Sequence, residues 1–529
     1  MSPQDDVVAR RAPHRGDPLE PAEGRAPGGA RASDDDGAAV VLPTHDDAVA
    51  AAASPVLGGP AGRRVRTGRR ALRGALAAGS ALGLLVLAAA VLLREHCRET
   101  LWASPGVYTH ACYSDVPALF ATASLDQVVP YLERFSDEAP LTAPFGVGWL
   151  LWGLGRLVGA EGTDGPRDVF DASVVLGAVA LVVLVAGVAH LSGRRPYDAV
   201  LVGASPVVLA CALVGVQLLP AALAVGALWA SSRGRALAAG MLLGLAALVA
   251  PPVGLAVGGA LLLVRWRRRR DDAAARAERP EAGAAAGPGD DIDGDDDDRP
   301  RQPLVVPEVR TALVALLVWV VGGLPVLLRS PEVWAGAVTA RVTAGPGYGS
   351  AWLLGDLAGA PPADVTTTGG SVLLTAAGVA GTAVLALRAP RAPRVPVLAL
   401  LLLLAVLAPA PALPPQAAVL VLPLAVLALP RWRLLLVWGA VETAAATGTW
   451  LYLYGLSVPD RGLPPWAYAV LVVARLGMLV VLAHGAVRAS LEPERDVVRA
   501  PRSAPHLGAD DPARPPERAL AGAAPGDPA

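Results

Sequence analysis

The sequence predicts an all-α polytopic membrane protein with about twelve transmembrane helices. Hydrophobic residues make up 53% of its 529 residues, and charged residues make up only 17%. The apolar residues fall in blocks of Leu, Val and Ala that are too long and too frequent for the core of a soluble protein. A helix of about 20 such residues spans the hydrocarbon core of a bilayer. We therefore take the bilayer as the solvent for most of the chain.

Arginine clusters between the apolar blocks predict how the chain crosses the membrane. The positive-inside rule places all of them in the cytoplasm; they lie at 63–73, 194–195, 233–235, 265–270, 388–394, 431–433 and 488–499. Two crossings fit between each consecutive pair, although 199–230 and 236–264 allow only short, tilted or broken pairs. The expected spans are 72–93, 171–190, 199–216, 218–230, 236–250, 253–264, 311–328, 372–387, 396–407, 417–429, 434–454 and 467–487. The result is a multi-pass protein of the plasma membrane with both termini in the cytoplasm.

One apolar stretch, 141–158, does not fit this pattern. It looks long enough to cross, but counting it would move every later arginine cluster to the outside. We therefore expect it to be interfacial or re-entrant. The longest extracytoplasmic loops are then 94–170 and 329–370, and polar chemistry can gather there.

Composition divides the chain into five parts. In chain order they are a disordered cytoplasmic tail (1–70), an N-terminal transmembrane part (71–270), a disordered acidic cytoplasmic linker (271–305), a C-terminal transmembrane part (306–490) and a disordered cytoplasmic tail (491–529). The Asp-rich run at 290–298 lacks the ligand spacing of a calcium-binding EF-hand loop, so we assign it no metal.

Several functional classes receive no support from the sequence. The net charge is −1 and the charges are segregated along the chain, so nucleic-acid binding is not indicated. The chain has no phosphate-binding Walker loop, no dinucleotide glycine fingerprint, no HExxH and no GxSxG motif. We expect no cofactor and no metal.

Cys97 and Cys112 lie in the same predicted extracytoplasmic loop. A zinc site would rarely use them without further Cys or His ligands. An outer loop faces an oxidising compartment, so we expect the two to form a disulfide.

Glu442 and Arg475 lie inside the last two predicted spans. A charge at that depth costs a few kcal/mol unless it faces a partner or water. Counting about 1.5 Å of rise per residue along antiparallel neighbours brings the two within reach of an arginine side chain. We expect a buried ion pair that orients the two helices.

Asp115 follows the first span by about twenty residues, in Tyr108-Thr-His-Ala-Cys-Tyr-Ser-Asp115. A carboxylate near the outer leaflet could act as general base for a hydroxyl that attacks an activated sugar, because the nucleophile must lose its proton as the bond forms. The alternative is an aspartate that caps a helix starting at Val116-Pro117. Spacing alone leaves both open.

An ordered set of short motifs carries a family resemblance. The landmarks are Tyr108-Thr-His-Ala-Cys-Tyr-Ser-Asp115, Val129-Pro-Tyr131, Glu138-Ala-Pro-Leu-Thr142, Arg195-Pro-Tyr-Asp198, Gly349-Ser-Ala-Trp352, Leu413-Pro-Pro-Gln416, Pro430-Arg-Trp432, Glu442 and Glu494-Arg-Asp496. In this order they resemble actinobacterial glycosyltransferase family 87. The resemblance covers about 72–499, and it lies in the set rather than in any one motif.

The resemblance implies a fold, an activity and a site. Members of the family have the GT-C fold and take mannose from polyprenyl-phosphate mannose on the extracytoplasmic side. Asp115 matches the family's catalytic aspartate. The resemblance further implies substrate contacts at five positions, with the arginine as the partner of the donor phosphate: Tyr113, Glu138, Gln217, Arg341 and Gln416. The implied partners are the polyprenyl-phosphate sugar donor, a glycolipid or polysaccharide acceptor and membrane lipids.

Four landmarks differ from the family pattern. Ala412-Leu-Pro-Pro-Gln416 replaces an Asn-Lys run before Ser-Pro-Gln-Tyr, and Glu138-Ala-Pro140 replaces Glu-Tyr-Pro. Gly215-Val216-Gln217 stands where the family commonly has Asn-Trp-Asp, and Leu248-Val-Ala-Pro251 stands where it has a Lys-aromatic-Tyr-Pro run. A departing lipid phosphate needs cations or donors to stabilise its charge. The alternative hypothesis is therefore a catalytically inactive relative that binds a lipid-linked sugar or acts as a membrane scaffold. A transporter would show two similar halves, and the sequence has no such repeat.

Overall fold

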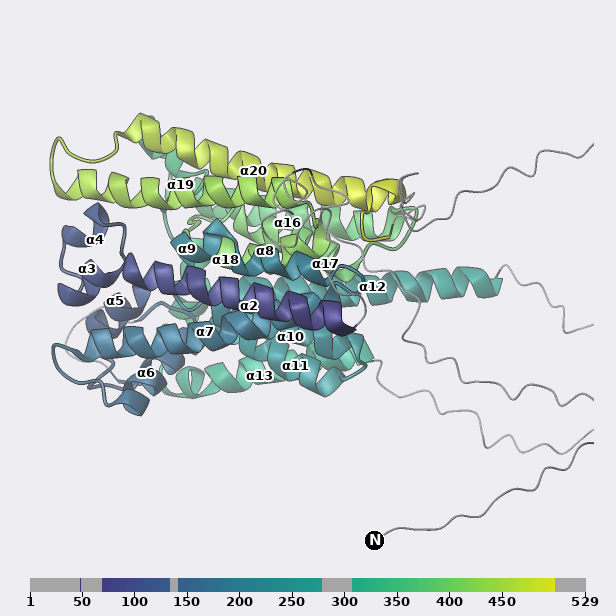
Figure 1. Ribbon diagram of the computed structural model, residues 1–529, viewed down its shortest axis with the longest axis horizontal. Helices are drawn as coiled ribbons and strands as arrows, with labels where there is room; N and C mark the ends of the chain where they lie inside the picture. Colours follow the sequence, from purple (N-terminus) through teal and green to yellow (C-terminus); the bar gives the residue numbers. More distant parts are fainter. Residues whose placement is uncertain (1–47, 49–68, 134–140, 278–306, 500–529) are drawn as a thin grey trace, which may run out of the picture. The chain divides into compact units, whose positions relative to one another are not determined.

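The computed structural model describes residues 48, 69–133, 141–277 and 307–499 (Figure 1). All of these residues fall in one compact unit, Ala39–Ala529. Every regular element in the described residues is a helix. Most of the predicted tails and of the acidic linker lie outside the described residues.

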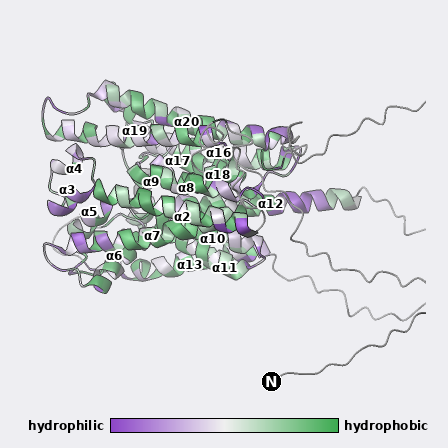
Figure 2. Cartoon of the chain, in the orientation of Figure 1, coloured by the Kyte–Doolittle hydropathy of each residue, from purple (hydrophilic) through white to green (hydrophobic). Residues whose placement is uncertain are grey.

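In the described ranges, six helices are long and apolar enough to cross a membrane. They are α2 (Arg69–Leu92), α7 (Gly165–Leu191), α13 (Pro307–Arg329), α16 (Asp364–Arg388), α19 (Trp432–Ser457) and α20 (Pro465–Leu491). Figure 2 shows hydrophobic residues along most of α2 and α7. The prediction of an all-α membrane protein is confirmed to this extent, and the number twelve stays a prediction.

The other six predicted spans fall on shorter or partly charged helices. Four coincide with α10 (Leu218–Ser232), α11 (Ala236–Val249), α17 (Val395–Leu407) and α18 (Ala417–Ala428). The span expected at 253–264 lies in the first part of α12 (Pro251–Ala277). The span expected at 199–216 is broken into η3 (Pro196–Ala199), α8 (Val200–Gly203) and α9 (Pro206–Cys211). Ser205 restarts the helix, because its hydroxyl accepts a hydrogen bond from Val207 N at 3.2 Å and Pro206 follows at the first position.

The short helices form the interior of the described bundle. All twelve residues of α18 are buried, as are nine of the thirteen in α17. α17 packs against α12 (Pro251–Ala277), α16, α18 and α20. Both helices are hydrophobic on every side, which is typical of a fully buried helix. Their low polarity therefore reflects a protein environment rather than contact with lipid.

Glycines allow two helix pairs to approach closely. A Cβ added at Gly244 of α11 would lie 2.7 Å from the carbonyl oxygen of Ala315 in α13, and Gly240 has the same kind of contact one turn earlier. A Cβ at Gly203 would lie 2.3 Å from the carbonyl oxygen of Gly79 in α2. Small residues four apart are the usual means by which membrane helices bring their backbones together.

The predicted first outer loop, 94–170, is helical over most of its described residues. It contains α3 (Glu95–Glu99), α4 (Gly106–Thr109), α5 (Asp115–Thr122) and α6 (Phe145–Val158). Cys97 and Cys112 form the predicted disulfide. Arg98 donates two hydrogen bonds to Asp171 of α7, at 2.9 and 2.7 Å. The loop is thus tied both to itself and to a long helix.

The stretch predicted to be interfacial or re-entrant forms α6, which packs against α7, α11 and α13. Its 14 residues rise by about 21 Å, less than the hydrocarbon core of about 30 Å. Its relation to a membrane stays a prediction.

Helix α12 extends into the predicted acidic linker. It continues through 271–277, which we assigned to disordered sequence. Arg267 explains the extension, because its Nη1 donates to the carbonyl oxygens of Ala386, Leu387 and Ala389 while its Nε donates to Asp271 at 2.8 Å. The same side chain satisfies the carbonyl end of α16. The predicted linker residues 278–305 lie outside the described residues.

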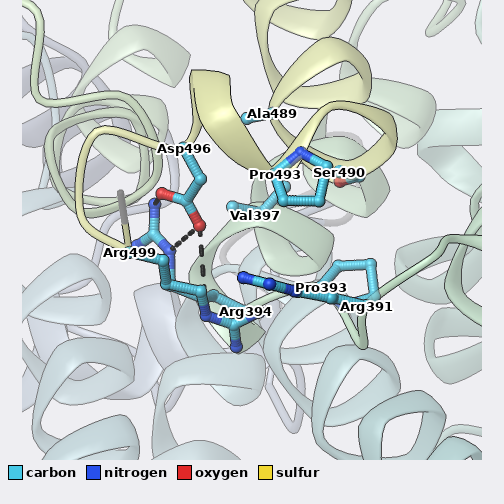
Figure 3. Close-up of a pocket in the computed structure, with 9 residues that line it drawn as sticks. All are labelled: Arg391, Pro393, Arg394, Val397, Ala489, Ser490, Pro493, Asp496 and Arg499. Atoms are coloured by element: carbon cyan, nitrogen blue, oxygen red, sulfur yellow. Dashed lines mark hydrogen bonds and ion pairs between the residues drawn. The ribbon is translucent and has the colours of Figure 1, made fainter. Parts of the chain in front are cut away.

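The described end of the chain, 492–499, packs against the helices although we assigned it to a tail. Arg394 donates to Asp496 at 2.9 and 3.0 Å, and to the carbonyl oxygens of Leu427 and Ala428 at 2.7 and 2.8 Å (Figure 3). Arg499 closes the loop with a bond to the carbonyl oxygen of Ala392 at 2.7 Å. One arginine therefore joins this segment to the C-terminal end of α18.

A pair of glycine substitutions tests the close packing of α11 and α13. We expect Gly244→Ala to lower the free energy of unfolding by about 1–3 kcal/mol, because the added methyl overlaps a backbone carbonyl that cannot turn away. Gly226→Ala in α10 is the matched control, since its Cβ would meet only the flexible Leu242 Cδ1 at 3.4 Å. Thermal unfolding of the two variants in detergent measures the difference, and equal midpoints would contradict the packing argument.

Candidate functional site

Asp115 is the first residue of α5, but it does not cap the helix. Ser114 takes that position with extended backbone angles, and its Oγ accepts a hydrogen bond from Val116 N at 3.4 Å. The alternative that Asp115 serves as the cap is therefore wrong. Its carboxylate is free for other contacts, although α5 still benefits from a negative charge in its first turn.

The Asp115 carboxylate lies against two side chains that the resemblance singled out. Gln416 Nε2 donates to Asp115 Oδ2 at 2.7 Å, across 301 residues of sequence. Tyr113 lies close enough for its hydroxyl to stabilise the charged carboxylate. Burial has the larger effect and raises the pKa of Asp115 from 3.8 to about 6. The charge of Asp115 in turn adds to the effect of burial in raising the pKa of Tyr113.

The backbone around Asp115 is fixed to the segment before α10. Asp115 N donates to the carbonyl oxygen of Val214 at 2.6 Å, and Ser114 Oγ donates to the same oxygen at 3.4 Å. Gln217 is three residues further along and precedes the first turn of α10. Gln416 holds the same position before α18, and α10 and α18 pack against each other. The positive ends of two helix dipoles thus lie near one carboxylate.

Two buried amide oxygens at the site have no partner among the described residues. They are Oε1 of Gln217 and Oε1 of Gln416, and only 7% of the Gln416 residue is exposed. A buried acceptor without a hydrogen bond costs about 1–3 kcal/mol. Both oxygens can accept hydrogen bonds from hydroxyl groups, so together with the carboxylate they form a set of acceptors suited to a polyhydroxylated ligand.

The predicted ion pair between Glu442 and Arg475 contacts the turn that precedes Gln416. Arg475 Nε donates to Glu442 Oε2 at 2.7 Å, and both residues are almost completely buried. Arg475 also donates to the carbonyl oxygens of Leu413 and Pro414 through its two Nη atoms. Trp438 Nε1 donates to Glu442 Oε1 at 3.2 Å. The pair therefore holds the turn that presents the Gln416 amide to Asp115.

The segment predicted to form the second outer loop, 329–370, packs against the same turn at Gly349. Its φ is +75°, and a Cβ added there would lie 2.4 Å from the Leu413 carbonyl oxygen and 2.6 Å from Arg475 Nη1. Gly349 N donates to the Tyr468 hydroxyl at 3.0 Å, and Leu413 N donates to the carbonyl oxygen of Tyr348 at 3.1 Å. Only glycine fits both this backbone conformation and this contact.

Aromatic rings gather next to the site. Tyr113 lies between Tyr108 and Trp450, with ring centroids 6.3 and 5.0 Å away. Tyr452 stacks on Tyr468 at 4.6 Å. Sequence reasoning missed Trp450, because nothing in the local pattern of α19 separates it from the other aromatic residues there. Rings of this kind offer an apolar face together with a polar edge.

A second residue that sequence reasoning missed is Arg94. It is 2% exposed, its Nη2 donates to the carbonyl oxygen of Ala210 at 3.1 Å, and burial lowers its pKa to about 10. Its Nε has no partner within the described part of the chain. A sequence signal did exist, since Arg94 directly ends the first apolar block. This buried cation binds the carbonyl oxygen of Ala210, four residues before Val214, whose carbonyl oxygen accepts from Asp115 N.

Two predicted contacts cannot be placed at the site. Glu138 lies outside the described residues. Arg341 belongs to α14 (Pro331–Thr343), and its role as a phosphate partner stays a prediction. In the residues that the structure describes, no three His, Cys, Asp or Glu side chains form a group that could hold a metal ion.

Stability measurements distinguish the roles of Ser114 and Asp115 at the start of α5. We expect Ser114→Ala to lower the free energy of unfolding by about 1 kcal/mol through loss of the cap. Asp115→Asn should not lower it. A raised pKa means that the folded state binds a proton more tightly than the unfolded chain, so wild-type stability falls as pH rises from about 4 through 6. Asp115→Asn removes this loss, so its advantage over the wild type should appear at pH 8 and not at pH 4.

Thermal unfolding of both variants at the two pH values is the measurement. A destabilised Asp115→Asn beside an unaffected Ser114→Ala would contradict the assignment of the cap.

Comparison of the chain with protein-family profiles, with curated proteins and with solved structures found no match. The family resemblance therefore rests on the landmarks in the sequence.

Proposed function

We propose that the chain is a membrane glycosyltransferase of the GT-C type with about twelve transmembrane helices. It would transfer a mannosyl, or more generally a hexosyl, unit from a polyprenyl-phosphate donor to a hydroxyl of an extracytoplasmic glycolipid or polysaccharide. One observation carries the proposal: Asp115 is a carboxylate with a raised pKa of about 6, free of a capping role and oriented by Gln416.

Asp115 has the properties of a general base for this reaction. A base works best when its pKa is close to the working pH, and the usual aspartate pKa of about 4 is too low for efficient proton removal at pH 7. In the proposed step the acceptor hydroxyl attacks the anomeric carbon and its proton passes to Asp115. The bond from that carbon to the phosphate oxygen breaks, and the polyprenyl phosphate leaves with the bonding electrons. The sugar is inverted at the anomeric carbon.

The neighbouring groups supply position rather than proton transfer. Gln416 binds one carboxylate oxygen, and the free amide oxygens of Gln416 and Gln217 would accept hydrogen bonds from sugar hydroxyls. Tyr113 would hold the sugar against its ring beside Trp450. Arg341 and Glu138 would complete the donor contacts, as the resemblance implies.

A specific observation also favours the alternative, a catalytically inactive relative that binds lipid-linked sugar. Leu248 stands at the position of the family's lysine, and its side chain packs with Tyr131 and Phe145 in an apolar cluster. A Cβ added at Gly322 would lie 2.6 Å from Leu248 Cδ1. A lysine ammonium could not occupy this position without losing its hydration. Donor binding without transfer is the result that this alternative predicts.

The first test is transfer by purified protein from a labelled polyprenyl-phosphate mannose to a membrane extract. We expect Asp115→Asn to lower the rate by on the order of 10²–10⁴, because the amide keeps the size of the carboxylate but cannot take a proton. Asp164→Asn is the matched control, since Asp164 is exposed in the same loop and makes no side-chain capping bond. Full activity of Asp115→Asn would exclude Asp115 as the base.

The second test follows the pH dependence of transfer. The base must be ionised, so the wild-type rate should fall as pH drops through about 6. Gln416→Ala removes a donor that favours the charged carboxylate, so the pKa of Asp115 should rise and the acidic limb should move to higher pH. Gln127→Ala, in an exposed position of the same loop, should leave the limb in place. An unshifted limb in Gln416→Ala would show that this hydrogen bond does not tune the base.

A further inference from the structure

An apolar groove is lined by residues that lie between 378 and 491 in the sequence, and none of these lining residues belongs to the candidate site around Asp115. It is lined by α17 with Leu401 and Leu404, by Ala408 directly after that helix, and by residues of α16 and α20. The cavity volume is about 580 Å³, and it is open on one side. Almost all of the lining is hydrocarbon, so the groove is suited to an apolar chain and not to a sugar.

One end of the groove is cationic. Arg388, the last residue of α16, lines the groove there. Arg388 is exposed, and no described residue pairs with it through a hydrogen bond or an ion pair. It also stands at the negative end of its helix dipole. The groove therefore combines an apolar lining with one positive charge unpaired among the described residues, that of Arg388, at one end.

More arginines lie near the Arg388 end of the groove. Arg391, Arg394 and Arg499 surround the single carboxylate of Asp496 (Figure 3). Burial lowers the pKa of Arg499; the charge of Asp496 raises it, and the nearby arginines lower it. Positive charge therefore exceeds negative charge in this region, and an additional anion nearby would reduce the repulsion.

The length of the groove limits what can occupy it. From Gly378 to Arg388 along α16 the rise is about 15 Å, at about 1.5 Å per residue. That is half of the hydrocarbon thickness of about 30 Å, the depth of one leaflet. A transmembrane helix of a partner protein would run across the full thickness of the membrane. Only about half of such a helix could therefore contact this groove. A single acyl chain has the right length.

We propose that this groove binds one acyl chain of an anionic membrane phospholipid, with the headgroup phosphate at Arg388. The apolar walls of α16, α17 and α20 would hold the chain, and the guanidinium would select an anionic over a zwitterionic headgroup. On the predicted topology this is a lipid of the cytoplasmic leaflet.

A matched pair of glycines on α16 provides the test. A Cβ added at either Gly381 or Gly369 would have nothing within 4 Å, but only Gly381 lines the groove. The full-length protein, purified in detergent and supplied with phosphatidylglycerol or phosphatidylcholine of equal chain length, would be analysed by native mass spectrometry for bound lipid. We expect the wild type and Gly369→Trp to retain phosphatidylglycerol in preference. The amount of phosphatidylglycerol bound to Gly381→Trp should be lower than in the wild type by a factor on the order of ten or more.

Arg388→Gln tests the headgroup separately. We expect its preference for phosphatidylglycerol over phosphatidylcholine to drop about fivefold, the change that follows from losing one arginine near an anionic headgroup. Arg388→Lys should keep most of the preference. Thermal unfolding of every variant shows whether the fold is intact, and Gly381→Leu replaces Gly381→Trp if the larger side chain disturbs it.

Four results would overturn the proposal. They are equal lipid loss in Gly381→Trp and Gly369→Trp, equal retention of the two phospholipids by the wild type, displacement of phosphatidylglycerol by an equimolar polyprenyl phosphate, and a change from dimer to monomer in Gly381→Trp without any change in bound lipid. The third would assign the groove to a carrier lipid, and the fourth would assign it to a second copy of the chain.

Discussion

The arrangement around Asp115 depends on the ion pair between Glu442 and Arg475. Two charges in an apolar interior are tolerated only when their remaining hydrogen-bonding groups are also satisfied, and removing one partner of such a pair costs about 3–5 kcal/mol. Here the extra donors of Arg475 go to the Leu413 and Pro414 carbonyl oxygens. The cost of burying the charge is thus offset by contacts that also set the position of Gln416.

This arrangement links parts of the chain that are far apart in sequence. The two C-terminal long helices carry the ion pair, the segment before α18 carries Gln416, and the start of α5 carries Asp115. Gly349 adds the second outer loop through its contact with Arg475. A buried charged network has few alternative geometries, because any displacement leaves a donor or a carbonyl without a partner. The carboxylate and the amide are therefore held at a defined distance without a metal ligand set or a covalent link between them.

Helix length separates the roles of the helices. The six long helices bury only part of their surface, from 17% to 50% of their most apolar windows, whereas every residue of α18 is buried. A short helix of this kind does not have to reach both faces of a bilayer by itself, since neighbouring helices cover it. α10 and α18 are both short, and both begin at a glutamine beside the candidate site. The positive ends of both helix dipoles therefore lie toward that region.

The sequence by itself determined the helical class, the six long apolar helices, the pairing of Cys97 with Cys112 and that of Glu442 with Arg475. These features depend on hydropathy and on spacing along one or two helices, which are local properties. Only the tertiary structure decided that Ser114 and not Asp115 caps α5, that Gln416 meets Asp115, and that Arg94 and Trp450 lie nearby. It also decided that 271–277 is helical and that 492–499 packs on α18, through contacts of Arg267 and Arg394 with distant carbonyl oxygens. Such contacts join residues more than thirty positions apart, and the pattern of one sequence does not specify which backbone oxygen a long side chain will reach.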